Sequence, residues 1–302
     1  MPAASDQSAD MQRGAAGLLA WVDGIRARLK RWQRPLGIAI AVLFIGGIVW
    51  SVGALDLSAD RINWGALAIL ALVMVPASQT YGAAGMVLLA RAGGHGIAWS
   101  QAVRSNNYAQ LAEVLPLPGG AIVRTGALVS AGSSRTRGAL LVTGGAVLWV
   151  AVAACAAGLT LELRGNPAGL ALIAPSVPAI AALVFLFARS ASWGTALLLL
   201  AHRLLGLVLT AVRLWLSFSA VGSTLRPFEM MPFALATIAG SASSIAPAGL
   251  GVSEAMAALI AGSMATAPAI AFLGVALNRL VGLGMVAVMV GVDHLRDPGS
   301  RG

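Results

Sequence analysis

Charge is scarce in this 302-residue chain: only 10% of its residues are charged, whereas 58% are hydrophobic, and the mean hydropathy is +0.85. Such values lie far from those of soluble globular domains and indicate an integral membrane protein. A single cysteine, Cys155, excludes an intrachain disulfide and a thiolate metal cluster. The histidines have no paired spacing, and there is no acidic cluster suited to Mg²⁺ and no nucleotide-binding motif. The sequence therefore predicts no metal and no other cofactor, and it disfavours an enzyme.

Six apolar stretches reach the roughly 20 residues that a helix needs to cross the hydrocarbon core. They are residues 35–55, 65–90, 139–161, 168–188, 195–222 and 269–292. Two further stretches, residues 98–131 and 230–265, are interrupted by proline and glycine but are too hydrophobic for ordinary loops. Non-helical backbone is tolerated at membrane depth only where protein or a water-filled cavity satisfies it. We therefore predict an all-α membrane fold with about six transmembrane helices plus two re-entrant helical hairpins.

Arginines are distributed unevenly between the predicted loops. Residues 1–34 are rich in them, and alternation from there places on the same side Arg91, Arg135, Arg137, Arg189, Arg296 and Arg301. Only Arg61, Arg164 and Arg226 fall on the other side. Because cytoplasmic loops accumulate basic residues, both termini are expected in the cytoplasm, with the chain in the cell (inner) membrane and residues 293–302 as a cytoplasmic tail.

Residues 1–34 form a basic segment before the first span. Apolar residues recur there at helical spacing with arginines between them, which suits an interfacial helix on anionic lipid headgroups. A basic anchor that only sets the orientation is the alternative. No folded basic module with interleaved aromatic residues is present, so a nucleic-acid partner is not expected.

With this orientation, the first interrupted stretch enters from the cytoplasm and the second from outside. Each half of the membrane domain, residues 35–292, then reads as span, span, re-entrant hairpin, span, first in residues 35–161 and again in residues 168–292. The order predicts two inverted-topology repeats, a plan typical of transporters, whose binding sites lie where broken helices meet near the midplane.

The two breaks have similar chemistry. LPLPGGAIVR, at residues 115–124, contains Pro118, Gly119, Gly120 and Arg124; IAPAGLGVSE, at residues 245–254, contains Pro247, Gly249, Gly251 and Glu254. An acid in the first turn of a helix is favoured by the helix dipole, whereas a cation there is not. Arg124 therefore needs an anion, which Glu113, Glu254 or a ligand phosphate would supply. Glu254 is predicted to be a gating partner or a proton-coupled carboxylate, and for both residues a purely structural ion pair is the alternative.

Other polar residues lie at predicted membrane depth. The arm before the first break carries Asn106, Asn107, Gln110 and Glu113. Three of them share one helical face, which would line a cavity unless the helix is simply amphipathic and superficial. Arg203, Arg213, Asn278 and Arg279 lie within the last spans, where a guanidinium suits phosphate, although Arg203 could instead extend to the cytoplasmic face. Ser243 and Ser244 would donate hydrogen bonds beside the second break, or small residues there would serve close packing.

Asn106 and Asn107 ahead of LPLPGGAIVR, IAPAGLGVSE after a serine-rich arm, and Arg279 in NRLVGLG together resemble the lysylphosphatidylglycerol synthase transmembrane region family, also called flippase-like membrane proteins. The resemblance extends over about residues 35–292 and departs at Ala121, where a polar residue is expected. It implies movement of lipids between leaflets. Longer members add a soluble aminoacyl-transferase domain, which is not seen before Gly302, so lysylphosphatidylglycerol synthesis is not implied. EVLPLPGG is also similar in its physics to the re-entrant motif of DedA-type lipid transporters.

These observations predict a lipid transporter, or flippase, for an amphiphile with an anionic headgroup: a phospholipid, a glycolipid or a polyprenyl phosphate. The expected partners are membrane lipids, with a homo-oligomer or a biosynthetic partner enzyme left open. Two alternatives stand beside this prediction. One is a membrane-embedded subunit of an enzyme that makes lipids or lipid-linked glycans, with Glu113 or Glu254 as its carboxylate; the other is a noncatalytic scaffold that acts through residues 1–34.

Overall fold

The computed structural model describes residues 41–113, 119–242 and 249–296. These residues are largely helical and include no strand, which confirms the all-α prediction. Five helices among them are long and apolar enough to cross a membrane. They are the continuous helix Trp64–Ala92, α6 (Arg135–Leu163), α7 (Ala168–Ser190), α8 (Trp193–Ala220) and α11 (Pro268–Arg296). Of the sixth expected span, the described part is a helix at Ala41–Ala54, and residues 35–40 lie outside the description.

The helix Trp64–Ala92 changes its winding where the sequence predicted one regular span. It comprises α2 (Trp64–Ile69), a π-helical segment η2 (Leu70–Met74) and α3 (Val75–Ala92). Pro76 follows the π segment, and a proline inside a helix lacks the N–H for the bond to the residue four positions earlier while its ring crowds that carbonyl. A local π turn is a common way to accommodate such a break without ending the helix.

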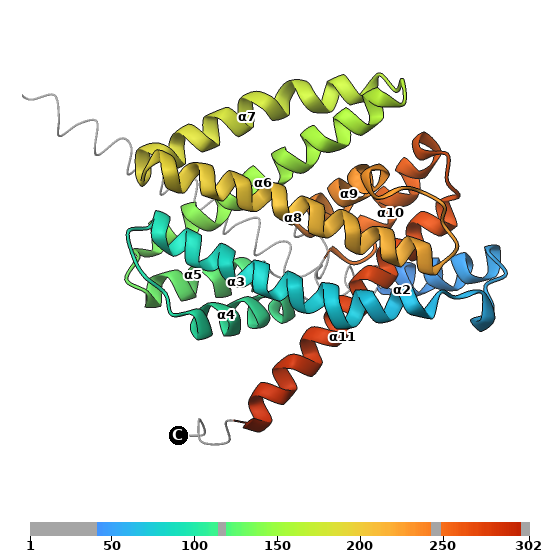
Figure 1. The fold of residues 1–302 in the computed structure, drawn as a ribbon, viewed down its shortest axis with the longest axis horizontal. Coiled ribbons are helices and arrows are strands. Elements are labelled where there is room, and N and C mark those ends of the chain that lie inside the picture. The colour runs from blue at the N-terminus through green and yellow to red at the C-terminus, as the bar shows by residue number, and fades with distance from the viewer. Residues whose placement is uncertain (1–40, 114–118, 243–248, 297–302) are drawn as a thin grey trace, which may run out of the picture.

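Four helices are too short to cross a membrane. They are α4 (Trp99–Ala112), α5 (Gly119–Ser130), α9 (Met231–Ala242) and α10 (Val252–Ile260), which continues into a 3₁₀ turn, η5 (Ala261–Met264). Even α4, with 14 residues, falls short of the roughly 20 that a span needs. α4 packs against α5, and α9 packs against α10. The two pairs lie towards opposite ends of the long axis of the molecule (Figure 1).

Contacts between the two halves of the chain follow a reciprocal pattern. α6, the last helix of the first half, contacts α9, and α11, the last helix of the second half, contacts α4. α7 packs along α6, while the helix Ala41–Ala54 packs on α11 through Phe44 and Phe272, whose rings lie 6.4 Å apart. α3 contacts α8. These contacts match in pairs: α6·α9 corresponds to α11·α4, and the α6·α7 contact corresponds to that between α11 and the helix Ala41–Ala54.

Small residues allow the helices to approach closely. On α6, a Cβ atom added at Gly158 would lie 2.7 Å from the Gly169 carbonyl oxygen of α7, and one added at Gly169 would lie 2.5 Å from the Gly158 carbonyl oxygen. The two backbones therefore touch at this pair. Close backbone contact at small residues is the usual means of helix association in lipid.

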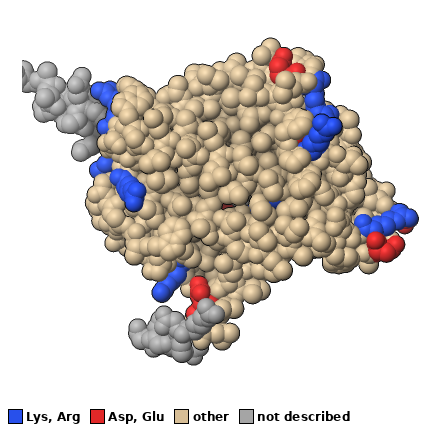
Figure 2. All heavy atoms as spheres, viewed as in Figure 1, with Lys and Arg blue, Asp and Glu red and all other residues tan. Residues whose placement is uncertain are grey.

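The surface is that of a protein surrounded by lipid. Figure 2 shows charged side chains gathered near the ends of the long axis and near the end of α11, with a wide band between them that is almost free of charge. Large apolar side chains are exposed on several helices, among them Leu140, Leu170, Leu205 and Val288. A band of this kind fits the hydrocarbon layer, which supports a multi-pass membrane protein.

Candidate functional site

Glu254 and Arg279 form an ion pair inside the protein. Gly251 precedes α10 with φ of +78°, a conformation that favours glycine, and the chain then turns Glu254 inward on the first helical turn. The Glu254 side chain is 0% exposed and that of Arg279, on α11, is 7% exposed, with Nη1 to Oε1 at 3.2 Å. A charge at this depth is costly unless an opposite charge lies beside it, and Glu254 and Arg279 neutralise each other.

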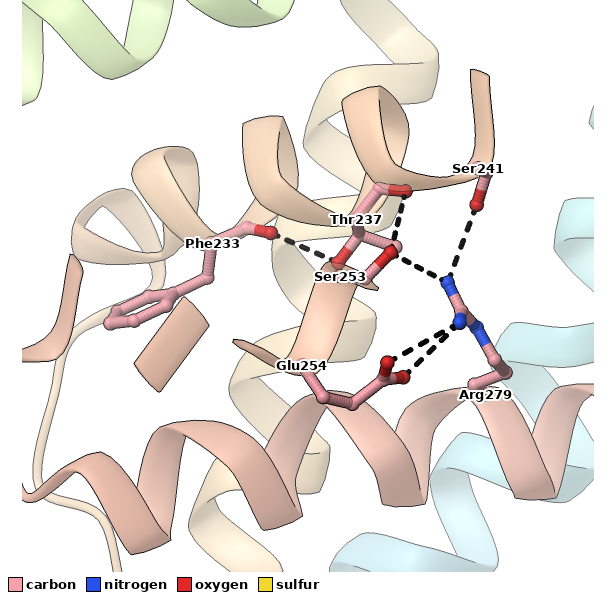
Figure 3. Close-up of polar contacts among 6 residues, drawn as sticks. All are labelled: Phe233, Thr237, Ser241, Ser253, Glu254 and Arg279. Atoms are coloured by element: carbon pink, nitrogen blue, oxygen red, sulfur yellow. Dashed lines mark hydrogen bonds and ion pairs between the residues drawn. The ribbon is translucent and has the colours of Figure 1, made fainter. Parts of the chain in front are cut away.

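Hydroxyl groups complete the surroundings of Arg279 (Figure 3). Its Nη2 donates to Ser253 Oγ at 2.8 Å and to Ser241 Oγ at 3.4 Å, and Ser253 Oγ in turn donates to the Thr237 carbonyl at 3.4 Å. Ser253 can approach α9 this closely because residue 240 is glycine: a Cβ atom there would collide with the backbone and side chain of Ser253. Three elements, α9, α10 and α11, therefore converge on one guanidinium.

Glycines also close the second break. Gly249 has φ of +68°, and a Cβ atom there would lie 2.5 Å from the Gly240 carbonyl oxygen, so this turn requires glycine on both counts. Ser243, Ser244 and Pro247, which the sequence placed in this site, lie outside the described residues, as does Pro118 of the first break.

Arg124 and Glu113 form the corresponding pair of the first half. Arg124 Nη2 lies 2.8 Å from Glu113 Oε1, with 27% and 35% of the side chains exposed. Gly119 and Gly120 are buried where α5 begins against the end of α4; a Cβ atom at Gly120 would lie 2.5 Å from Glu113 Cγ. Of the three anions proposed for Arg124, the structure places Glu113 beside it.

Polar side chains of α4 face α3 inside the protein. Gln79 of α3 accepts from Asn106 Nδ2 at 2.8 Å and donates from Nε2 to Gln110 Oε1 at 2.9 Å. Asn106 and Asn107 are 3% and 2% exposed, so α4 is not a superficial amphipathic helix. The Asn107 Oδ1 atom is buried without a hydrogen-bond partner. The Asn106 amide packs against Gly82 of α3, where a Cβ atom would overlap the amide group.

Two further arginines come from α8. Arg213 donates from Nε to Asn278 Oδ1 at 3.2 Å and from Nη2 to the Asn278 carbonyl at 3.4 Å. Arg203 lies with its Cζ 5.4 Å from the centroid of the Trp149 ring and interacts electrostatically with Tyr81, while its Nε has no hydrogen-bond partner. Both are partly buried. Neither faces a carboxylate within the described part of the chain.

The charges of the two halves meet. Arg279 interacts electrostatically with Glu113 as well as with Glu254, and Arg203 interacts electrostatically with Arg124. Arg213 is connected to these charges through its hydrogen bond to Asn278, the residue before Arg279. We call these six residues the central charged cluster: Glu113, Arg124, Arg203, Arg213, Glu254 and Arg279. Its four guanidinium groups against two carboxylates leave an excess of two positive charges.

This arrangement suits an oxyanion. Guanidinium groups bind phosphate or carboxylate oxygens through paired N–H donors. Among residues 41–113, 119–242 and 249–296, no three His, Cys, Asp or Glu side chains are grouped as a metal ion would require. The guanidinium groups of the central charged cluster are fixed cations that can bind a negatively charged group.

Several residues of the site were not predicted from the sequence. Gln79 joins two predicted residues of α4, and Ser253 joins Arg279 to α9. Trp149 and Tyr81 surround Arg203. The amide of Gln79 inside an apolar run was the available signal, since polar groups at membrane depth usually have a function or a partner.

No protein-family model matches this chain, and no curated protein matches it. The resemblance to the lysylphosphatidylglycerol synthase transmembrane region therefore stays a prediction from short motifs.

Proposed function

We propose that the protein is a membrane transporter that moves an amphiphile with an anionic headgroup between leaflets. One observation carries the proposal: four arginines against two carboxylates form a cluster that links the two pairs of short helices with α8 and α11. A phospholipid, a glycolipid or a polyprenyl phosphate has the required headgroup charge. In this view the protein is not an enzyme, and its multi-pass domain lies in the cell membrane with both termini in the cytoplasm.

We infer that the membrane domain consists of two inverted repeats. In this interpretation α4–α5 and α9–α10 are re-entrant hairpins, and the helix Ala41–Ala54 belongs to the first of six spans. The reciprocal contacts support it, since a two-fold relation within the membrane exchanges α6·α9 with α11·α4 and maps α3·α8 onto itself. Broken helices that meet at the centre of such a pair of repeats form transporter binding sites.

In the proposed mechanism the two ion pairs hold the empty site. Arg203 and Arg213, which have no acidic partner in the described residues, attract the headgroup first. Arg124 and Arg279 then exchange their carboxylates for headgroup oxygens while the acyl or prenyl tails stay in lipid. The Glu254 to Arg279 contacts of 3.2 and 3.5 Å are longer than the roughly 2.7–2.9 Å of a strong charge-assisted hydrogen bond, so this pair is weaker than one at optimal distance. Rocking of one half against the other alternates access to the two leaflets.

The test is lipid movement in liposomes that contain the purified protein. Lipids labelled on an anionic or a zwitterionic headgroup are compared for wild type, Arg213→Gln and Arg279→Gln. Wild type should accelerate movement of the anionic lipid, and each variant should reduce that rate by at least about tenfold, the loss expected when a charged donor leaves a desolvated site.

Arg61→Gln is the matched control, because Arg61 is exposed and its guanidinium pairs with Asp56 rather than with the central charged cluster. Its rate should equal that of wild type. Rates for wild type that equal those of protein-free liposomes with every lipid would refute transport. Equal losses for anionic and zwitterionic lipids would contradict headgroup recognition by charge.

A further inference from the structure

His202 and Tyr81 lock α8 to α3 in a reciprocal manner. Their rings are stacked, with centroids 3.9 Å apart and planes 10° from parallel. The His202 ring lies on Gly85 of α3, where a Cβ atom would approach Cε1 to 2.8 Å, and the Tyr81 ring lies on Gly206 of α8, where a Cβ atom would overlap it. On α3, Tyr81 is followed four residues later by Gly85, against which the His202 ring packs. On α8, His202 is followed four residues later by Gly206, against which the Tyr81 ring packs.

The hydrogen bond of His202 defines its tautomer. Nε2 lies 3.0 Å from the Tyr81 carbonyl oxygen, which can only accept, so Nε2 carries the proton in the neutral ring. Nδ1 is then a lone-pair acceptor. It is buried and has no hydrogen-bond partner, in a residue that is only 8% exposed. Buried polar atoms are rarely left unpaired without a reason, and this one is a base.

The groups around His202 are positively charged or neutral. Arg203 follows it on α8, Arg124 of α5 interacts with Arg203, and Tyr81 of α3 is the remaining titratable neighbour. α6 contributes the uncharged indole of Trp149, and α7 carries no titratable residue before Arg189. The Arg203 guanidinium therefore opposes a second positive charge at Nδ1 while the site is empty. An anion bound to Arg203 would offset that repulsion.

We propose that His202 binds a proton together with the anionic headgroup, so that the protein is a proton–lipid symporter. This inference rests on the proposed lipid transport. The step adds one proton from the aqueous phase to the Nδ1 lone pair, which converts the neutral imidazole into an imidazolium while the Nε2–H bond to Tyr81 is kept. When the headgroup leaves Arg203 on the other side, repulsion by Arg203 returns and the proton leaves Nδ1.

Linkage makes the proposal quantitative. If the headgroup favours protonation of His202, the proton must favour headgroup binding by the same factor. For one linked proton, the affinity for the headgroup changes by at most about tenfold per pH unit, and it increases as the pH falls. The stacked rings of Tyr81 and His202 join α3 of the first proposed repeat to α8 of the second. A change in the charge of His202 therefore also affects the α3–α8 contact, which must change when one repeat rocks against the other.

The first experiment counts protons in wild type alone. Binding of short-chain phosphatidylglycerol, whose headgroup does not titrate near neutral pH, is measured by calorimetry in two buffers of different ionisation enthalpy. Uptake of up to one proton per lipid supports the proposal. Binding without proton uptake across the neutral and mildly acidic range overturns it, and this result does not depend on a variant that folds.

The second experiment uses liposomes with an internal pH dye and compares wild type with His202→Gln. Glutamine can donate to the Tyr81 carbonyl in place of Nε2–H but cannot take up a proton. Wild type should move protons together with anionic lipid and respond to a pH gradient, whereas His202→Gln should move lipid without protons and ignore the gradient. His95→Gln is the control, since His95 lies beside Gly132, away from the cluster, and should behave as wild type.

The outcomes separate the two proposals. No lipid movement by wild type refutes transport itself. Lipid movement that carries no protons, and that is equally insensitive to the gradient in wild type and His202→Gln, leaves transport standing and refutes proton coupling.

Discussion

Arg279 and Glu254 form the most deeply buried ion pair in the described part of the chain, with side chains 7% and 0% exposed and 3.2 Å between Nη1 and Oε1. Arg124 and Glu113 are closer, at 2.8 Å, but remain 27% and 35% exposed. The two pairs therefore differ in what their loss should cost. Removing one member of a buried pair leaves an unpaired charge in a medium that solvates it poorly, whereas a half-exposed charge retains solvent.

We predict that Glu254→Gln lowers the free energy of unfolding by about 3–5 kcal/mol, because Arg279 stays buried and loses the carboxylate with which it forms its ion pair. Glu113→Gln should lower it by less than about 1 kcal/mol. Reversible unfolding in mixed detergent micelles measures both. The double variant Glu254→Gln with Arg279→Gln should recover part of the loss, and equal effects of the two single variants would contradict the assigned burial.

Glycine at the start of α5 is the second test. Gly120→Ala should destabilise the protein by about 1–3 kcal/mol, because its Cβ atom would lie 2.5 Å from Glu113 Cγ and 2.9 Å from the Ala109 carbonyl oxygen. Gly126→Ala is the matched control on the same helix: no atom lies within 4 Å of the added Cβ. Alanine is a better helix former than glycine by about 1 kcal/mol, so this control should be neutral or stabilising in the same unfolding assay. A loss at Gly126 as large as at Gly120 would show that close packing is not the cause.

Sequence reasoning located the long helices because a membrane span requires about 20 apolar residues, and this requirement is visible in composition alone. It also identified Glu254 and Arg279 individually, since ionisable residues in apolar segments stand out. It left open which acid faces which arginine, because pairing depends on tertiary packing: Arg279 and Glu254 are 25 residues apart. The predicted need of Arg124 for an anion followed from the helix dipole, but only the structure selects Glu113 among the three candidates.

Contacts between distant segments account for what the sequence could not provide. Gln79 bonds residues 27 and 31 positions away, and His202 bonds the Tyr81 carbonyl 121 positions away. Their positions in apolar segments indicate that they have partners, but nothing local identifies which distant residue each one bonds. The π turn before Pro76 was missed for a related reason, since a proline in a span is compatible with a kink, a break or a wider turn.

Glu229 links two loops at one end of the molecule and should make stability depend on pH. Burial raises the pKa of Glu229, but the Arg226 N–H at 2.7 Å, the hydrogen bond from Arg164 and the charges of both arginines outweigh it, and the net effect is a lowered pKa. A lowered pKa in the folded state stabilises the fold above the ordinary value of 4.5, and this stabilisation is lost as the pH falls through the folded-state pKa.

The Glu229→Gln variant should therefore be less stable than wild type at neutral pH, and the difference should shrink below about pH 4.5. Unfolding in detergent micelles at a series of pH values checks this. Glu162→Gln, which removes an exposed acid from the last turn of α6, is the control and should be as stable as wild type at neutral pH. A difference between Glu229→Gln and wild type that stays constant with pH would contradict the ionised contact.

The inverted repeat makes a prediction about the sides of the membrane. α5 runs from the centre of the molecule towards one end, and α10 with η5 runs towards the other (Figure 1). Gly126 on α5 and Gly262 on η5 are exposed, and no atom lies within 4 Å of a Cβ added at either, so single cysteines should be tolerated in a Cys155→Ala background. A membrane-impermeant thiol reagent applied to sealed vesicles should label Gly126→Cys from the cytoplasmic face and Gly262→Cys from the opposite face. Ala168→Cys, at the exposed start of α7, is the control for the outer face, and labelling of Gly126→Cys and Gly262→Cys from the same side would refute the inverted arrangement of the two hairpins.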